Sequence, residues 1–397
     1  MGHSRTIAIV IAYFTFAITA KGGDLSHAQF IWDFFKASFD ERHNLVTAPF
    51  AVRMGMTLMT GAVNDRYTQR QLRNKLHLQD SVAKTSESYR RQLAALSRTG
   101  DIRIGTKVIA FGTDDFNSAF LAGSRYFNAS IEKHTRLNVA HVNSVANGWA
   151  KLVTSGMVQN VLKSKDLESN TRLLLLNAIA FRGQWKHPFD VDKTKEEIFH
   201  TGDEAIRYHT EMMNLPATVL QTGVYEPLKA VAVELPFRDG TDLSLLVIMP
   251  QQLHGNATQI VQNLNQSSFE DLLSGLQPTK IGVKLPKLSF SNTVDVNAVL
   301  RNLALNVPFE WSVFQVFKNE RLVLDQVKHG VSIEFDEKGA RTVFDFSGTN
   351  TQSVFSANRP FIYVVIKRST QFPLFLGNFA RSAGSASSTF FKQVNNS

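Results

Sequence analysis

The chain has 397 residues, of which 43% are hydrophobic, and it contains no cysteine. It therefore has no disulfide, no thiolate nucleophile and no cysteine metal site, so its stability must come from a large core. The net charge of +9 permits binding to acidic proteins or glycosaminoglycans, but no recognised nucleic-acid motif accompanies it. We expect no nucleic-acid partner.

The first 20 residues have the pattern of a secretory signal peptide. Arg5 gives a basic start, the apolar run from Ile7 to Ile18 is too short to span a bilayer, and Thr19-Ala20 supplies small residues for cleavage. No later apolar run approaches membrane-spanning length. We therefore predict a secreted, extracellular monomer that begins near Lys21 and has no membrane partner.

Acceptor sequences for N-glycosylation fit an exported protein. Each lies in a polar context where a glycan would be solvated, although a match of this length often arises by chance. The candidates are Asn128-Ala-Ser, Asn256-Ala-Thr and Asn265-Gln-Ser.

Helical patterns come first along the mature chain. Apolar residues recur at helical spacing from Phe30 to Phe39 and again from Met54 to Ala62, after Pro49. The segment from Ser144 to Val158, which carries Trp149, predicts a third helix. Aromatic stripes at this spacing are usually core, and we assign them no further role.

Strand patterns dominate from Leu173 onward, with short helical patterns at 259–264, 269–276 and 294–303 between them. No internal repeat, low-complexity block or linker interrupts the chain before Ser382. We predict one α+β domain over residues 21–381 with large, mainly antiparallel sheets, followed by a flexible tail over 382–397. The expected strands are 173–181, 230–237, 243–249, 281–288, 331–335, 361–366 and 374–379.

The usual enzyme motifs are absent from the sequence. It has no G-x-S-x-G elbow, no H-E-x-x-H pair, no Walker loop and no dinucleotide fingerprint after a strand. The 11 histidines are scattered and lack the spacing of a helical metal pair. We therefore expect that the protein is not an enzyme and that it has no catalytic residue, no cofactor and no metal site.

A series of recognisable motifs extends over nearly the whole mature chain. The most recognisable run is Leu176-Asn177-Ala-Ile-Ala-Phe181-Arg-Gly-Gln-Trp185. The other motifs are Asn44–Val52, Asn147–Gly156, Val233–Phe237, Leu245–Pro250, Leu285–Lys287 and Pro373–Asn378. Any one motif is weak, but in order and spacing together they resemble the serpins, the suicide inhibitors of serine proteases. The resemblance implies a serpin-like fold with a large central sheet, additional sheets and about eight or nine helices.

The resemblance implies a mechanism that depends on an exposed reactive loop. In serpins a protease cleaves this loop, and its N-terminal part then inserts as a strand into the central sheet and traps the acyl-enzyme. The segment from Phe355 to Phe361 resembles the far anchor of the loop. The spacing found in typical inhibitory serpins places the scissile bond near Ser353-Val354. The corresponding hinge is Glu337, Lys338, Gly339, Ala340, Arg341, Thr342, Val343 and Phe344.

Strand alternation tests whether this loop tolerates insertion. The small Ala340 takes the first inward position, and the charges of Arg341 and Asp345 face outward, which favours insertion. Against it, Phe344 and Phe346 face inward where inhibitory serpins carry small residues, and overpacking costs about 1–3 kcal/mol. Such a cost slows loop insertion, which has to be faster than deacylation of the protease for the protease to be trapped.

The short length of the loop is a stronger argument against inhibition than the size of its side chains. Few residues separate Gly339 from Pro360, so the Ser353-Val354 bond lies too close to the far anchor for a protease to grip it. The stretch from Thr342 to Asn358 also contains no Lys or Arg, which leaves trypsin-like proteases without bait. We hypothesise weak or lost inhibition and a binding or regulatory role toward a serine protease or a non-protease protein. The alternative is a functional inhibitor of an elastase- or chymotrypsin-like protease.

Two further features carry open alternatives. Asn177 and His329 match the polar pair of the family's shutter, where the sheet opens, but its usual serines are replaced by Ala48 and Ala51; a hydrogen-bonded core histidine is the simpler interpretation of His329. Basic clusters on probable helices are either solvated faces or a polyanion site. These clusters are Arg66, Arg70, Arg73 and Lys75, and Arg90, Arg91 and Arg98.

Overall fold

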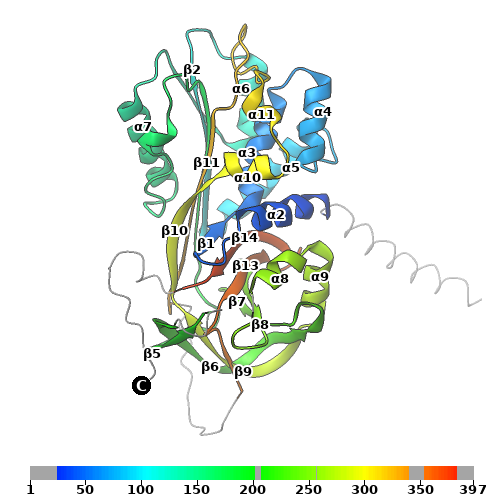
Figure 1. Cartoon of the computed structure of the whole chain (residues 1–397), viewed down its shortest axis with the longest axis vertical. Helices are drawn as coiled ribbons and strands as arrows, with labels where there is room; N and C mark the ends of the chain where they lie inside the picture. The colour runs from blue at the N-terminus through cyan, green and yellow to red at the C-terminus, as the bar shows by residue number, and fades with distance from the viewer. Residues whose placement is uncertain (1–24, 202–206, 256, 339–352, 382–397) are drawn as a thin grey trace, which may run out of the picture.

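The computed structural model describes residues 25–201, 207–255, 257–338 and 353–381 (Figure 1). The predicted signal peptide and tail lie outside these residues. The described chain forms two sheets and ten α-helices, close to the number expected. The helices are α2 (Leu25–Ser38), α3 (Pro49–Gly61), α4 (Arg66–Lys75), α5 (Val82–Ser97), α6 (Ser118–Ser124), α7 (Val139–Val153), α8 (Ala257–Asn263), α9 (Gln266–Ser274), α10 (Val296–Asn302) and α11 (Val307–Glu310).

A five-stranded sheet runs along the upper part of the molecule in Figure 1, in the order β10-β11-β4-β2-β3. Two of its pairings, β11 with β4 and β2 with β3, are parallel, and the other two are antiparallel. β4 is buried along all but its last residue, which explains its uninterrupted apolar run. The strands are β10 (Leu288–Asp295), β11 (Gln326–Phe335), β4 (Leu173–Arg182), β2 (Ile102–Phe111) and β3 (Ser130–His134).

A nine-stranded sheet forms the other end of the molecule, in the order β1-β14-β13-β8-β7-β6-β9-β12, with β5 also paired to β6. Its pairings are antiparallel except that between β12 and β9. The strands are β1 (Leu45–Thr47), β5 (Asp190–His200), β6 (Arg207–Tyr225), β7 (Ala230–Pro236), β8 (Leu243–Pro250), β9 (Gln277–Pro286), β12 (Val354–Ser356), β13 (Phe361–Lys367) and β14 (Phe372–Phe379).

Helices cover both faces of the five-stranded sheet. α7 lies on one face and α3 on the other (Figure 1). α7 packs Val142, Ala146 and Ala150 against apolar residues of β2 and β4. A Cβ on Gly105 of β2 would lie only 2.8 Å from a methyl group of Val153, so glycine is needed for this close approach. α3 is buried along almost its whole length.

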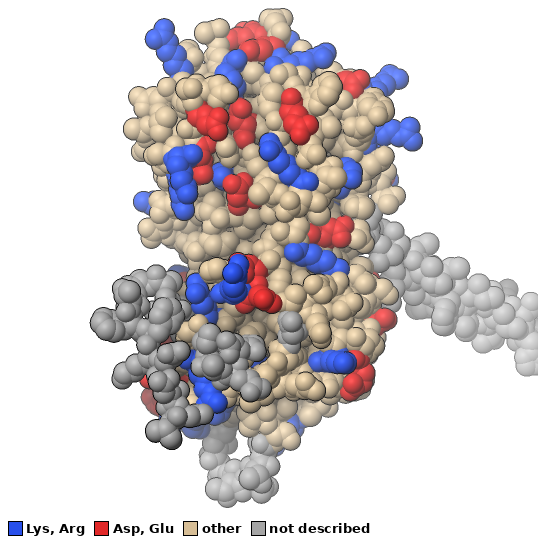
Figure 2. All heavy atoms as spheres, in the orientation of Figure 1, with Lys and Arg blue, Asp and Glu red and all other residues tan. Residues whose placement is uncertain are grey.

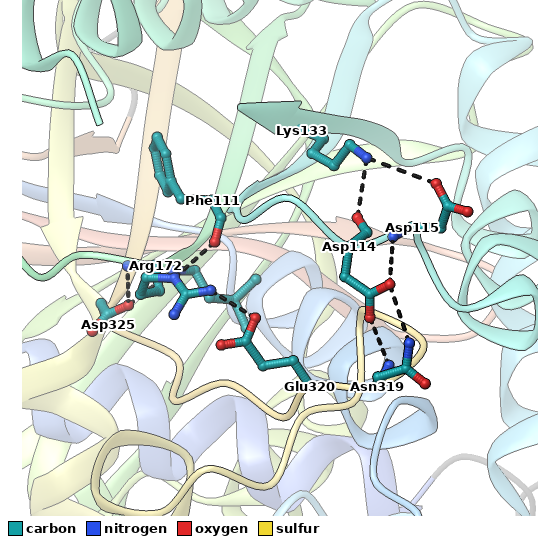
Figure 3. A network of polar contacts seen from close by, with 9 residues as sticks. Phe111, Asp114, Asp115, Lys133, Arg172, Asn319, Glu320 and Asp325 are labelled. Atoms are coloured by element: carbon teal, nitrogen blue, oxygen red, sulfur yellow. Dashed lines mark hydrogen bonds and ion pairs between the residues drawn. The ribbon is translucent and has the colours of Figure 1, made fainter. Parts of the chain in front are cut away.

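Polar contacts fasten the central strands at the end where β4 and β11 begin (Figure 3). The Asp325 carboxylate accepts the backbone N–H groups of Arg172 at 2.7 Å and Leu173 at 2.8 Å. The Arg172 guanidinium donates to the Phe111 carbonyl at 2.7 Å and to Glu320 at 2.8 Å. Burial raises the pKa of Asp325, although the two N–H groups oppose the change. One carboxylate thus joins the starts of β4 and β11.

The structure corrects some predicted boundaries. The helix expected over 144–158 is α7, which begins five residues earlier because the Asn138 side chain accepts the backbone N–H of His141 at 3.0 Å. β1, β2, β3, β5, β6 and β10 were not predicted as strands. No helix in the described part of the chain is long and apolar enough to cross a membrane.

Candidate functional site

The junction between β11 and β4 is closed along its whole length. Nine residue pairs join the two parallel strands, from Gln326 opposite Leu174 to Glu334 opposite Arg182. At the last pair the Arg182 guanidinium also donates to the Glu334 carboxylate at 2.8 Å. A chain that turned back after β11 would run antiparallel to both strands. The resemblance to serpins implies that an inserted loop strand would enter at this junction.

The first hinge residues are fixed beside the end of β11. The Glu337 side chain is buried, accepts the Thr194 hydroxyl at 2.7 Å, and lies 3.0 Å from the Lys287 ammonium. Burial raises the pKa of Glu337, but the hydrogen bonds from Thr194 and Lys287 outweigh it and lower the pKa below its ordinary value. The hydrogen bond to Glu337 in turn raises the pKa of Lys287. Glu337 is thus held as a charged anchor.

Backbone contacts continue this anchor to Lys338. The backbone N–H of Phe189 donates to the Glu337 carbonyl at 3.1 Å and that of Trp185 to the Lys338 carbonyl at 3.2 Å. The Trp185 indole N–H donates to the Asp336 carbonyl at 2.6 Å, and its ring stacks on Phe237 with centroids 4.7 Å apart. The hinge leaves β11 over this aromatic cluster. Gly339, Ala340, Arg341, Thr342, Val343 and Phe344 lie outside the described residues.

The predicted shutter pair lies in the middle of the closed junction. His329 of β11 is opposite Asn177 of β4, and both side chains are completely buried. The backbone N–H of Ala48 donates to Nε2 of His329 at 3.1 Å, and the Thr106 hydroxyl donates to Oδ1 of Asn177 at 3.0 Å. Burial lowers the pKa of His329 to about 3. His329 is thus a buried, neutral histidine that accepts a backbone hydrogen bond.

Two buried donors in this pair have no acceptor among the described residues. They are Nδ1 of His329 and Nδ2 of Asn177. Ala48 and Ala51 are fully buried at the start of α3, and further along the same face Gly55 approaches Asn177 so closely that a Cβ would lie 3.1 Å from its amide. The resemblance to serpins implies serine hydroxyls at these two positions, and this chain has none there. An unsatisfied buried donor costs about 1–3 kcal/mol.

The far anchor begins at the candidate scissile bond. The Ser353 carbonyl accepts the Gly282 backbone N–H at 3.1 Å, and Val354 and Phe355 pair with Gly282 and Val283 of β9. Phe355 is buried, whereas Val354 is 52% exposed. Arg359 completes the anchor by donating to the Pro250 carbonyl at 2.8 Å. The Ser353-Val354 bond thus lies within the hydrogen-bonded edge of the sheet.

The remaining predicted residues are scattered over the surface. Asn128 and Asn265 are exposed, and Asn265 also caps α9 by accepting the Ser268 backbone N–H at 3.1 Å; Asn256 lies outside the described residues. No group of side chains in the described part of the chain could hold a metal ion. Lys287 and Thr194 were missed as partners of Glu337, although each lies in a segment that the resemblance covers.

His329 gives the protein a predictable pH dependence. The pKa of His329 is about 3 in the folded state and about 6.5 in the unfolded state, so unfolding takes up a proton below pH 6.5. The free energy of unfolding therefore decreases as the pH is lowered below 6.5. From pH 7.5 to 5.5, the wild type should lose about 1.4 kcal/mol more unfolding free energy than His329→Gln. Urea unfolding measures both slopes, with His43→Gln as an exposed control. Equal slopes for wild type and His329→Gln would refute this assignment.

A hydroxyl returned to the shutter should stabilise the closed sheet. Ala51→Ser offers an acceptor to the unsatisfied donors of Asn177 and His329, and we expect a gain of about 1 kcal/mol in unfolding free energy. Ala51→Cys is the matched control, since it adds similar volume with a much weaker acceptor. A serine variant no more stable than the cysteine variant would show that these donors are satisfied in another way.

Loss of the Glu337 carboxylate should loosen the hinge. Glu337→Ala removes the acceptor of Thr194 and the partner of Lys287, and should cost about 1–2 kcal/mol at pH 7. Because the folded-state pKa of Glu337 is lowered, its contribution is present above the unfolded value of 4.5 and disappears as pH falls through the folded value. The exposed Glu196→Ala is the control. A variant as stable as wild type at pH 7 would contradict this role.

Comparisons with known proteins match the whole described fold. The family model "Serpin (serine protease inhibitor)" matches residues 25–382. Bovine alpha-2-antiplasmin is 30% identical over 347 residues, which cover 86% of this chain and 68% of that protein.

Solved structures agree with this match. SRPN18 from Anopheles gambiae superposes with a TM-score of 0.81 at 20% identity, over 90% of this chain and 97% of that one. Native protease nexin-1, determined with heparin, gives a TM-score of 0.78 at 21% identity, over 91% and 98%. At these identities the structures support the fold alone. The match of the family model over residues 25–382 establishes that the chain belongs to the serpin family.

Proposed function

We propose that this chain is a secreted serpin in which suicide inhibition is weak or lost, and which acts by binding a protein partner. Serpins inhibit serine proteases and are not themselves catalytic, so the question is whether this member keeps the family activity. The observation that carries the proposal is the position of the Ser353-Val354 bond, whose carbonyl is already bonded to Gly282.

Cleavage at that bond conflicts with the far anchor. A protease binds several substrate residues in extended form on both sides of the bond, through their backbone groups. Here Val354, Phe355 and Ser356 already pair with β9, and Phe355 is buried. Access would require β12 to separate from β9. This supports a loop that presents no bait at the position the family uses.

A bond nearer the hinge fails for a different reason. Cleavage after Phe346, the last aromatic residue before Ser353, leaves only the seven residues from Ala340 to Phe346 for insertion. The closed junction has nine residue pairs between β11 and β4. A seven-residue strand would not reach the end where Asp325 joins them. Ordinary cleavage without trapping is the expected outcome.

The alternative function is inhibition of an elastase- or chymotrypsin-like serine protease. Its support is topological, because β11 leads directly into the hinge and lies parallel to β4, as insertion requires. Alpha-2-antiplasmin, a similar protein, is itself named for antagonism of plasmin. Phe344 and Phe346 are the residues that would attract such a protease.

The melting temperature before and after loop cleavage separates the two functions. Chymotrypsin should cut after Phe344 or Phe346 and leave the melting temperature nearly unchanged, because the shortened strand does not complete the sheet. A variant with seven alternating Ala and Thr residues inserted after Phe346 is the control, and we expect its melting temperature to rise on cleavage. A large rise in the wild-type chain would refute lost insertion.

A polyanion is a second partner that we propose, at a groove beside α4. The groove has a volume of about 690 Å³ and its lining contains no acidic side chain. Arg66, Arg70 and Arg73 recur along one face of the helix, and His77 follows them. Arg66 and Arg70 pair with no described carboxylate. Over much of the face shown in Figure 2, basic side chains lie interspersed with acidic ones.

Heparin chromatography tests this site. Arg66→Gln/Arg70→Gln should elute from a heparin column at clearly lower salt than wild type, because two charges are lost from one groove. Arg91→Gln/Arg98→Gln, which removes the same charge from α5 and its C-cap, is the matched control and should shift elution less. Equal shifts would indicate non-specific attraction to the net positive charge.

A further inference from the structure

A small cleft lies between α5 and the nine-stranded sheet, away from the loop and the shutter. Its volume is about 130 Å³, close to the cavity of roughly 150 Å³ that accepts benzene in another protein. One wall is the last two turns of α5, and the others are the turn before β8 and the turn between β13 and β14. All of the lining segments belong to the described residues.

The walls of this cleft are joined to one another without a ligand. The Arg238 guanidinium, beside the turn before β8, donates to the Thr99 carbonyl at 2.7 Å and to Asp101 at 2.9 Å, just after α5. Asp242 accepts the Ser369 backbone N–H at 3.0 Å from the turn between β13 and β14. The cleft is therefore preformed, and a ligand would bind with little cost of ordering its walls.

The floor of the cleft is apolar and its own polar groups are largely satisfied. Leu96, Leu243 and Leu374 are buried beneath it, and the half-buried Phe372 forms one side. The Thr99 and Thr241 hydroxyls donate to the carbonyls of Leu96 and Arg238 at 2.8 and 2.9 Å. Nothing in the floor calls for a polar ligand group, so the inner part of a ligand must be apolar and about the size of one ring.

The rim supplies one positive charge. Lys367, the last residue of β13, lines the cleft and forms no ion pair with any described carboxylate. Two carboxylates of the neighbouring segments are engaged elsewhere, since Glu234 lies 2.8 Å from the Arg368 guanidinium and Asp242 accepts a backbone N–H of the β13–β14 turn. We propose that the cleft binds a small amphipathic carboxylate, with a single ring against Leu96 and Phe372 and the carboxylate beside Lys367.

Phenylacetate and its neutral analogue phenylacetamide are suitable probes. Methyl NMR of Leu96, Leu243 and Leu374 should show saturable shifts with phenylacetate, and phenylacetamide should bind about three- to tenfold more weakly. Lys367→Gln should abolish this preference while the amide still binds. Lys151→Gln, which removes an exposed charge on α7, is the matched control and should leave both affinities unchanged.

A blocking variant distinguishes the cleft from other apolar surfaces. Ala95 is exposed at the rim, so Ala95→Trp should fold normally while filling the opening, and binding of both probes should disappear. The proposal is overturned if neither probe shifts the three leucines at millimolar concentration, if acid and amide bind equally to wild type, or if Ala95→Trp binds as well as wild type.

Discussion

The closed parallel junction between β11 and β4 is the constraint on which the rest of the structure depends. Nine residue pairs, the carboxylate of Asp325 at one end and the Arg182–Glu334 pair at the other hold the two strands together. Any inserted strand must break these contacts and replace them with its own. The family mechanism is therefore available to this chain only if the loop can supply enough residues.

Both ends of that loop are fixed by contacts unrelated to a protease. Glu337 is held by Thr194 and Lys287, and the chain is held again from Ser353 by its bond to Gly282. The residues between these anchors have to serve as bait and as the inserting strand. In the function that we propose, a bond near the far anchor is held in the sheet, and a bond near the hinge leaves too short a strand for insertion. The small number of residues in the loop thus limits both its recognition by a protease and its insertion as a strand.

The elements predicted from the sequence are those with a regular pattern of buried side chains. β4 is apolar because it is buried on both faces, and α3 begins at Pro49 and carries an apolar stripe. β2 was missed because Gly105 faces α7 and the buried Lys107 carries a charge that pairs with Glu132, so the strand shows no simple alternation. Tertiary contacts determine which residue type fits at such positions, and the local sequence pattern does not show those contacts.

The candidate site was predictable to the same degree. Motif resemblance identified Glu337, Asn177 and His329, and the register indeed places the last two opposite each other. It did not reveal that His329 accepts from Ala48 while one of its nitrogens has no described partner, because this depends on how α3 packs beneath the sheet. Nor did it reveal Lys287 as the partner of Glu337, since the two are fifty residues apart in sequence.

Incubation with a chymotrypsin-like protease, followed by denaturing electrophoresis and intact mass measurement, tests the central claim most directly. If the residues between the anchors are too few to trap a protease, the products are two fragments of this chain and a free, active protease. A covalent adduct with the mass of the protease plus the N-terminal fragment would show that insertion outruns deacylation, and would contradict the account.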